Sequence, residues 1–204
     1  MMENFLVSEE FIGLSDNKKI KNSLLGRSRV RQLYMVGGLF FDLLLLDAIE
    51  FDSKDKIKIN SDYENIIEDE TLLKLCSIIK EQKSKTFKGW ISYFNIPSKN
   101  RVLLYNSLIK NISQTNNSKD FVVQRLRAEL LEPGNVSDET VALALLLKAS
   151  KLLKEYFSNY EIKEINNRIE LFKKENAKRW SNIKQIGKEI EYMDALILSS
   201  AILI

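Results

Sequence analysis

The segment from Leu33 to Ile49, LYMVGGLFFDLLLLDAI, constrains the fold more than any other part of the chain. In a helix from about Val30 to Ala48 it is apolar on nearly every side, so other elements must surround it. Its Gly37-Gly38 pair would let a neighbouring element approach closely, at a helix-propensity cost of about 1 kcal/mol for each glycine. Aspartates interrupt the segment, and a membrane span needs about 20 apolar residues. We therefore predict a buried central helix rather than a membrane span.

The composition predicts a mostly α protein with one small β-hairpin. The chain has 204 residues, of which 45% are hydrophobic, so it can bury a full core, and we expect residues 1–204 to form a single globular domain. Two prolines and seven glycines are too few for a fold rich in turns. Directly after the central helix, IEFDSKDKIKI at 49–59 has a polar turn and alternating residues, which predicts the hairpin.

Apolar residues recur at helical spacing through the rest of the chain. Ser8 suits the start of a short helix, and Ser137 has the side chain of an N-cap for a long helix that runs to Phe157. Polar loops are expected at 60–65 and 114–120. The apolar tail from Met193 to Ile204 is too short to span a membrane, so we expect it to end a core helix. The predicted helices cover 69–81, 86–94, 98–110, 121–131, 137–157, 162–176 and 178–203.

One stretch of the chain is strongly cationic. The segment from Lys18 to Phe41 contains no Asp or Glu and leads directly into the central helix. A cationic segment joined to an apolar element suits an anionic surface. The overall net charge is only +3, so the basic character is local and permits a single anionic docking face. The cations of this segment are Lys18, Lys19, Lys21, Arg27, Arg29 and Arg31.

This cationic stretch has more than one interpretation. It can be a solvated arm whose charges cluster by chance. It can also bind phosphate groups, because guanidinium forks match phosphate oxygens in pairs. Phospholipids and nucleic acids both carry phosphates. However, no aromatic residues interleave with the cations and no nucleic-acid motif is present, so we expect no nucleic-acid partner.

The sequence offers few groups for catalysis. It has no His, which removes the commonest general base and every Ser–His or Cys–His nucleophile pair. Cys76 lies on the apolar side of its predicted helix, where an inert core thiol is expected, and alone it forms neither a disulfide nor a zinc site. The acidic run at 62–70 matches no calcium loop. We expect a non-enzymatic protein without cofactor or metal.

Five segments, taken in their order, carry a resemblance to a known family. They are LVSEEFIGLSDNKK, GGLFFDLLLLDAIEF, TLLKLCSIIKEQKSKTFKGWISYF, QRLRAELLE and TVALALLLKASKLLKEYF. In order and spacing, from about Leu6 to Leu203, they resemble the Golgi phosphoprotein 3 family, and the abundant Lys, Asn and Ile suggest a bacterial relative. The resemblance implies a mostly helical domain that lies on membranes as a peripheral protein. Eukaryotic members of the family bind phosphatidylinositol 4-phosphate and retain glycosyltransferases by binding their cytoplasmic tails.

The resemblance also indicates where a lipid head group would bind. The family holds it with a Trp and an Arg that flank the start of the central helix, and with an Arg pair that precedes a later helix. In this chain Arg27 occupies the Trp position and Val36 that of the first Arg. The Arg pair falls near Pro97, with Lys99 and Arg101 as the closest cations. The family hairpin used for oligomer contacts is shortened here to the loop at 114–120, which leaves the oligomeric state open.

Two main functional hypotheses follow, and a small-molecule enzyme is a third, distant one. In the first, the chain is a cytoplasmic, peripherally membrane-associated adaptor that binds anionic phospholipid head groups through a basic face, with cytoplasmic tails of membrane proteins as further partners. In the second, it is a soluble scaffold whose basic segment binds acidic protein tails. The cytoplasmic location is expected because acidic residues replace the features of a secretory signal between Met1 and Leu14. The candidate head-group residues are Arg27, Arg29, Arg31, Lys99 and Arg101.

Overall fold

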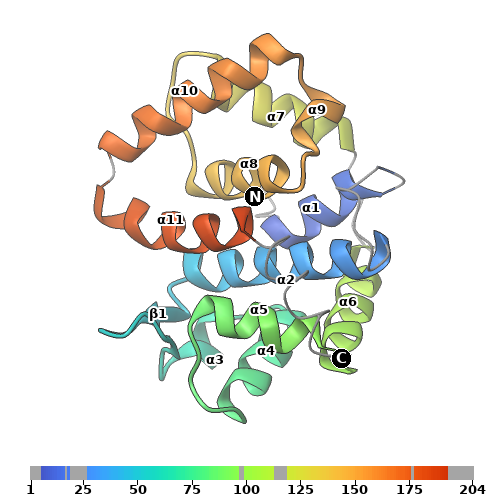
Figure 1. Ribbon diagram of the computed structural model, residues 1–204, viewed down its shortest axis with the longest axis vertical. Coiled ribbons are helices and arrows are strands. Elements are labelled where there is room, and N and C mark those ends of the chain that lie inside the picture. Colours follow the sequence, from blue (N-terminus) through green and yellow to red (C-terminus); the bar gives the residue numbers. More distant parts are fainter. Residues whose placement is uncertain are drawn as a thin grey trace.

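The computed structural model describes residues 6–16, 18, 27–96, 99–112, 119–175 and 177–192. In this part of the chain, eleven helices and two short strands are arranged around α2 (Arg27–Leu45), which crosses the middle of the molecule (Figure 1). Helices α1, α8 and α11 pack on one side of α2, and α4, α5 and α6 on the other. The predicted mostly α fold with a central apolar helix is confirmed.

Helix α1 (Val7–Ser15) lies against α2 and receives its N-terminal cap from it. The buried carboxylate of Asp42 accepts hydrogen bonds from the backbone N–H groups of Val7, at 2.7 Å, and Ser8, at 3.1 Å. These donors belong to the first turn of α1, where helical partners are lacking. The close approach predicted at the glycine pair is confirmed at Gly38, because a Cβ atom there would lie 2.9 Å from the Cα of Ser8.

The predicted hairpin is confirmed by β1 (Ile49–Phe51) and β2 (Ile57–Ile59), which pair antiparallel with Ile49 opposite Ile59. It leads into three helices: α3 (Tyr63–Ile66), α4 (Glu70–Lys80) and α5 (Phe87–Asn95). Asp69 caps α4 by accepting from Leu72 N at 2.8 Å, and Thr86 caps α5 by accepting from Gly89 N at 3.2 Å. Local sequence thus sets both helix starts. Helix α6 (Lys99–Ile112) then packs against α2, α4 and α5.

The second half of the described chain covers the other side of α2. It comprises α7 (Lys119–Leu131), α8 (Asp138–Ala149), α9 (Leu153–Tyr156), α10 (Asn159–Glu175) and α11 (Ala177–Glu191). Ser137 caps α8 as predicted, accepting from Thr140 N at 3.2 Å. Every residue of α8 from Thr140 to Leu147 is buried, so this helix and α2 share the core.

Two details of the sequence prediction are wrong, and a third lies mostly outside the described residues. The helix expected from Ser137 to Phe157 breaks after Ala149, because Lys151 adopts a left-handed conformation with φ of 63°. The loop expected at 60–65 contains the start of the short helix α3. Residues 119 and 120 of the expected loop at 114–120 belong to α7, and the rest lie outside the described residues, as does the tail from residue 193 onward.

No helix in the described ranges has both the length and the apolar character needed to cross a bilayer.

Candidate functional site

The candidate cations predicted from the sequence lie near the place where three helices pack together. The first half of α2, the C-terminal end of α5 and the start of α6 pack on one another (Figure 1). The apolar stripe of α5 fixes this arrangement, since Trp90 and Phe94 are fully buried and Trp90 lies 6.3 Å from Phe40 of α2, measured between ring centroids. Residues far apart in sequence are therefore held together by the core beneath them.

Arg29 and Arg101 converge at the C-terminal end of α5. The Nη2 of Arg29 donates to the carbonyl oxygen of Asn95. The Nη1 of Arg101 donates to the carbonyl oxygen of Phe94 and lies 3.4 Å from those of Asn95 and Ile96. The last carbonyls of a helix carry partial negative charge and lack helical partners. Both guanidinium groups thus share one row of neutral acceptors.

The two arginines influence each other electrically. Burial lowers the pKa of Arg101 below its ordinary value, and the nearby positive charge of Arg29 lowers it further. The side chain of Arg101 is held on its other side by Gln32, whose Oε1 accepts from Nε at 3.1 Å. Arg29 is half-buried, and its Nε has no hydrogen-bond partner although it is shielded from solvent. A buried donor in that state costs free energy.

The other candidate residues are placed differently. Lys99 begins α6, is exposed, and makes no ion pair with any described residue. Arg31 points to a separate partner set, since its Nη1 lies 3.5 Å from Asp16 Oδ1 and its Nη2 donates to the hydroxyl of Tyr105. Arg27 begins α2, but its side chain lies outside the described part. We call Arg29, Arg101 and the exposed Lys99 the cationic junction, although Lys99 begins α6 two positions before Arg101 and lies on another side of that helix.

Sequence reasoning missed a second acid-free stretch that contributes to this surface. Residues 82–119 contain no Asp or Glu, and they include all of α5 and α6. This stretch packs against the first acid-free stretch, in α2, so the two reinforce one another in space. A scan for missing acidic residues along the whole chain would have found it. Its cations are Lys83, Lys85, Lys88, Lys99, Arg101, Lys110 and Lys119.

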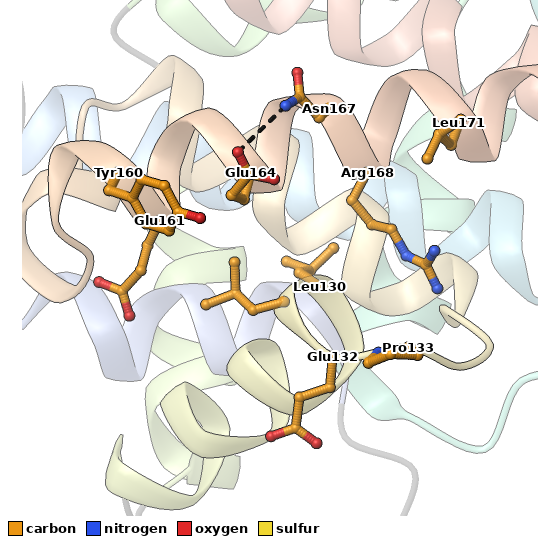
Figure 2. Close-up of a pocket in the computed structure, with 10 residues that line it drawn as sticks. Leu130, Glu132, Pro133, Tyr160, Glu161, Glu164, Asn167, Arg168 and Leu171 are labelled. Atoms are coloured by element: carbon orange, nitrogen blue, oxygen red, sulfur yellow. Dashed lines mark hydrogen bonds between the residues drawn. The ribbon is translucent and has the colours of Figure 1, made fainter.

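A groove of about 430 Å³ lies elsewhere, between α10 and the end of α7 (Figure 2). Glu161 in this groove is held by Arg127, with Arg127 Nε 3.2 Å from Glu161 Oε1, and by Ser158 N at 2.7 Å. Ser158 and Arg127 lower the pKa of Glu161. Glu132 is exposed, and the guanidinium of Arg168 donates to the carbonyl of Gly134. The predominance of carboxylates disfavours an anionic ligand here. The groove is lined by Leu130, Leu131, Glu132, Pro133, Tyr160, Glu161, Glu164, Asn167, Arg168 and Leu171.

The residues considered for metal or nucleophile chemistry have structural partners. Cys76 is fully buried, and burial raises the pKa of its thiol to about 12, so little thiolate exists near neutral pH. In the acidic run, Asp69 caps α4 and Glu70 pairs with Lys74, with Lys74 Nζ 2.8 Å from Glu70 Oε1. Within the described ranges, no three acidic or cysteine side chains gather as metal ligands would.

No model of a protein family matches the chain, and no curated protein matches it either. The resemblance to the Golgi phosphoprotein 3 family therefore stays a prediction from the residues.

Proposed function

We propose that this chain is a non-enzymatic peripheral membrane protein that binds the phosphate groups of anionic phospholipids at the cationic junction. The observation that carries the proposal is the convergence of Arg29 and Arg101, which come from two acid-free stretches and lie close enough for one to lower the pKa of the other. Two like charges in a half-buried place repel each other, and the carbonyls of α5 offset this only in part. A bound anion would offset it further.

The three cations of the junction would contribute to phosphate binding in different ways. Arg29 is only half-buried, so the exposed part of its planar guanidinium would contact phosphate oxygens. Lys99 is exposed and its ammonium ends a long side chain, so it would meet phosphates at the membrane surface. Arg101 is almost fully buried at 7% exposure, so it contributes positive potential and holds the end of α5 in place. Each cation near an anionic surface contributes about 1 kcal/mol.

The surroundings favour a lipid surface over a nucleic acid. Single-stranded nucleic acids stack their bases on exposed aromatic rings beside the cations. The nearest rings here are engaged: Tyr93 lies 5.6 Å from Trp90 in an edge-to-face contact, and Tyr105 lies 5.6 Å from the guanidinium carbon of Arg31. Ile96, between the two acid-free helices α5 and α6, is instead an exposed aliphatic residue. Aliphatic groups beside cations suit the boundary between head groups and acyl chains.

The adaptor role belongs to this proposal because of the family resemblance. A protein held at a cytoplasmic membrane face by phosphates would be well placed to bind cytoplasmic tails of membrane proteins. Which phosphate-bearing lipid it prefers, phosphatidylinositol 4-phosphate included, is part of the same test.

The test is sedimentation of the full chain with vesicles of phosphatidylcholine alone, phosphatidylcholine with phosphatidylglycerol, and phosphatidylcholine with phosphatidylinositol 4-phosphate, at low and moderate salt. We expect no binding to the first and salt-sensitive binding to the second. Tighter binding to the third at equal lipid charge would identify an inositol-phosphate preference. Equal binding to neutral and anionic vesicles, or none to any, would contradict the proposal.

A charge-matched pair of variants locates the site. Lys99→Glu changes the net charge as much as Lys154→Glu, and both residues are exposed on helices. Lys154 lies on α9, at the other end of the molecule from α6 (Figure 1). Lys99→Glu should weaken binding to anionic vesicles by about tenfold or more, because a reversed charge changes the free energy by about 2 kcal/mol. Lys154→Glu should weaken it much less.

A related experiment addresses the soluble scaffold. The wild type is tested for binding to acidic peptides in detergent without lipid. If it binds them but binds no vesicles, and Lys99→Glu abolishes the peptide binding, the junction is a protein-binding site instead.

A further inference from the structure

Helix α6 has an outer face that is unusual for a surface helix. Its inner face is buried, with Leu104 and Leu108 fully enclosed in the core. On the outer face, Val102, Leu103 and Ile109 are 43%, 48% and 38% exposed, at positions that share one side of a helix. A helix between core and solvent normally has mostly polar residues outside. Here the exposed Asn106 lies among three exposed apolar residues, so the face is mixed and its apolar part favours a covering partner.

Exposed apolar side chains are concentrated there. Among the described residues, nine large hydrophobic side chains are exposed; three of them lie on α6, and Ile96 lies just before it. Helix α4 shows the ordinary pattern, since Glu70 and Lys74 on its outer side form an ion pair with Nζ 2.8 Å from Oε1. Apolar groups gathered on one face mark a binding surface more than scattered ones do.

The charges on this face indicate what covers it. Lys99 and Lys110 lie on the same side of α6 as the apolar residues, one at each end, and α6 contains no Asp or Glu. The half-buried Arg29 lies beyond the start of the helix. Aliphatic side chains framed by cations match a surface that is negative outside and apolar beneath.

A second copy of the chain matches this face poorly. In an antiparallel pair of α6 helices, Lys99 of one copy would face Lys110 of the other, and in a parallel pair each lysine would face itself. Either arrangement brings like charges together. An anionic bilayer meets both the charge and the apolar character.

We propose that the outer face of α6 docks on anionic lipid bilayers, with Val102, Leu103 and Ile109 entering the acyl boundary and Lys99 and Lys110 remaining among the phosphates. This inference rests on the proposed function and adds the mode of attachment. It makes binding partly hydrophobic, so that a fraction survives at salt concentrations that screen the charges.

A fluorescent label at position 103 tests this directly. Leu103→Cys is labelled with an environment-sensitive dye, and Leu171→Cys on α10 is the matched control, because Leu171 is 47% exposed, as Leu103 is 48%. Cys76 does not compete, since it is buried and its pKa is raised to about 12. With vesicles of phosphatidylcholine and phosphatidylglycerol, we expect the emission at position 103 to shift to the blue and that at 171 to stay unchanged.

Sedimentation of Asn variants provides the second measurement. The double variant with Val102→Asn and Leu103→Asn should bind the same vesicles about tenfold or more weakly, with unchanged dependence on salt. Leu171→Asn should leave the binding unchanged. Circular dichroism of each variant confirms that it is folded.

The outcomes separate this inference from the proposed function. If the wild type sediments with anionic vesicles but position 103 does not shift and the Asn variants bind normally, only the role of α6 is overturned. If the wild type does not bind, both fail. An emission already shifted to the blue without vesicles would show that another part of the chain or a second copy covers α6, and would also overturn the inference.

Discussion

Lys151 is the residue with the most evident local strain. Its φ of 63° is left-handed, and it follows the end of α8, where Leu152 N donates to Leu147 O at 2.8 Å and Lys151 N to Lys148 O at 3.0 Å. This pattern of bonds ends many helices, and glycine is the usual residue at the left-handed position because other residues pay a steric cost of about 1 kcal/mol there.

Lys151→Gly should therefore raise the free energy of unfolding, by up to about 1 kcal/mol, because the relieved strain exceeds the added entropy of the unfolded chain. Lys154→Gly is the control. Because Lys154 lies inside α9, this variant should lower the free energy of unfolding by about 1 kcal/mol. Urea denaturation at constant pH measures both. A Lys151→Gly protein that loses as much stability as Lys154→Gly would show that the left-handed conformation is not strained.

At the scale of elements, the packing of α1 on α2 depends on Gly38. A Cβ atom at this position would lie 2.9 Å from the Cα of Ser8, a backbone atom that cannot turn aside, and 3.3 Å from Leu146 Cδ2. Gly38→Ala should destabilise the protein by about 1–3 kcal/mol, because α1 must move away and weaken its bonds to Asp42.

Gly13→Ala gives the matched control within α1. A Cβ atom at Gly13 meets no other atom within 4 Å, so the substitution should raise stability by about 0.5–1 kcal/mol through helix propensity alone. Urea denaturation of the two variants should thus give changes of opposite sign. Two gains, or two losses, would contradict the proposed contact between α1 and α2.

The same contact shows what the sequence could and could not predict. The apolar pattern around 30–48 predicted a central helix, and the glycine pair predicted a close neighbour, because both are local signals. That Asp42 caps α1 could not be predicted, since its partners at Val7 and Ser8 are more than thirty positions away. The break at Lys151 was missed because a lysine carries no signal for a left-handed conformation.

The candidate site was predictable only in part, for similar reasons. The sequence selected Arg29 and Arg101 as cations, but tertiary packing alone brings them to the same carbonyls of α5. It also grouped Arg31 with Arg29, whereas the helical turn between them directs Arg31 to Asp16, 3.5 Å away. The apolar outer face of α6 was not predicted, because the outer face of a helix cannot be assigned before its inner face is known.

At the scale of the whole molecule, the acid-free helices and the carboxylate-lined groove lie apart. The acid-free helices α5 and α6 lie on one side of α2, and the carboxylate-lined groove lies between α7 and α10 on the other (Figure 1). The acidic run at 62–70 lies on the same side of α2 as these helices, so only the local basic surface of α5 and α6 would turn the protein toward an anionic membrane. A net charge of +3 alone would not orient the molecule. Lys99→Glu and Lys154→Glu change this net charge equally, so a difference between them reports the place of binding rather than the total charge.

The acid–base behaviour of the whole molecule follows from carboxylates around α1. Burial is the main cause that raises the pKa of Asp42 to about 7 and that of Glu9 to about 7, and burial also raises that of Glu10. Hydrogen bonds from Ser8 and Val7 offset the effect at Asp42 only in part, and Arg125 does so at Glu10. The folded state therefore keeps protons on these groups at pH values where the unfolded chain has released them.

This sets the sign of the pH dependence. Between about pH 4 and pH 7 the folded state binds more protons, so the free energy of unfolding should fall as the pH rises through this interval. Groups with lowered pKa values, such as Glu129 and Glu161, have the opposite sign, but they act below the ordinary pKa of a glutamate and hence mostly below this interval.

Urea denaturation at several pH values between about 4 and 7 measures this effect. The wild type should lose stability steadily, and the variant with both Asp42→Asn and Glu9→Gln should lose much less, because neither replacement can titrate. A wild-type stability that is constant or rises over this interval would mean that the bonds from α1 hold Asp42 ionised, and that the cap of α1 is a charged one at every pH tested.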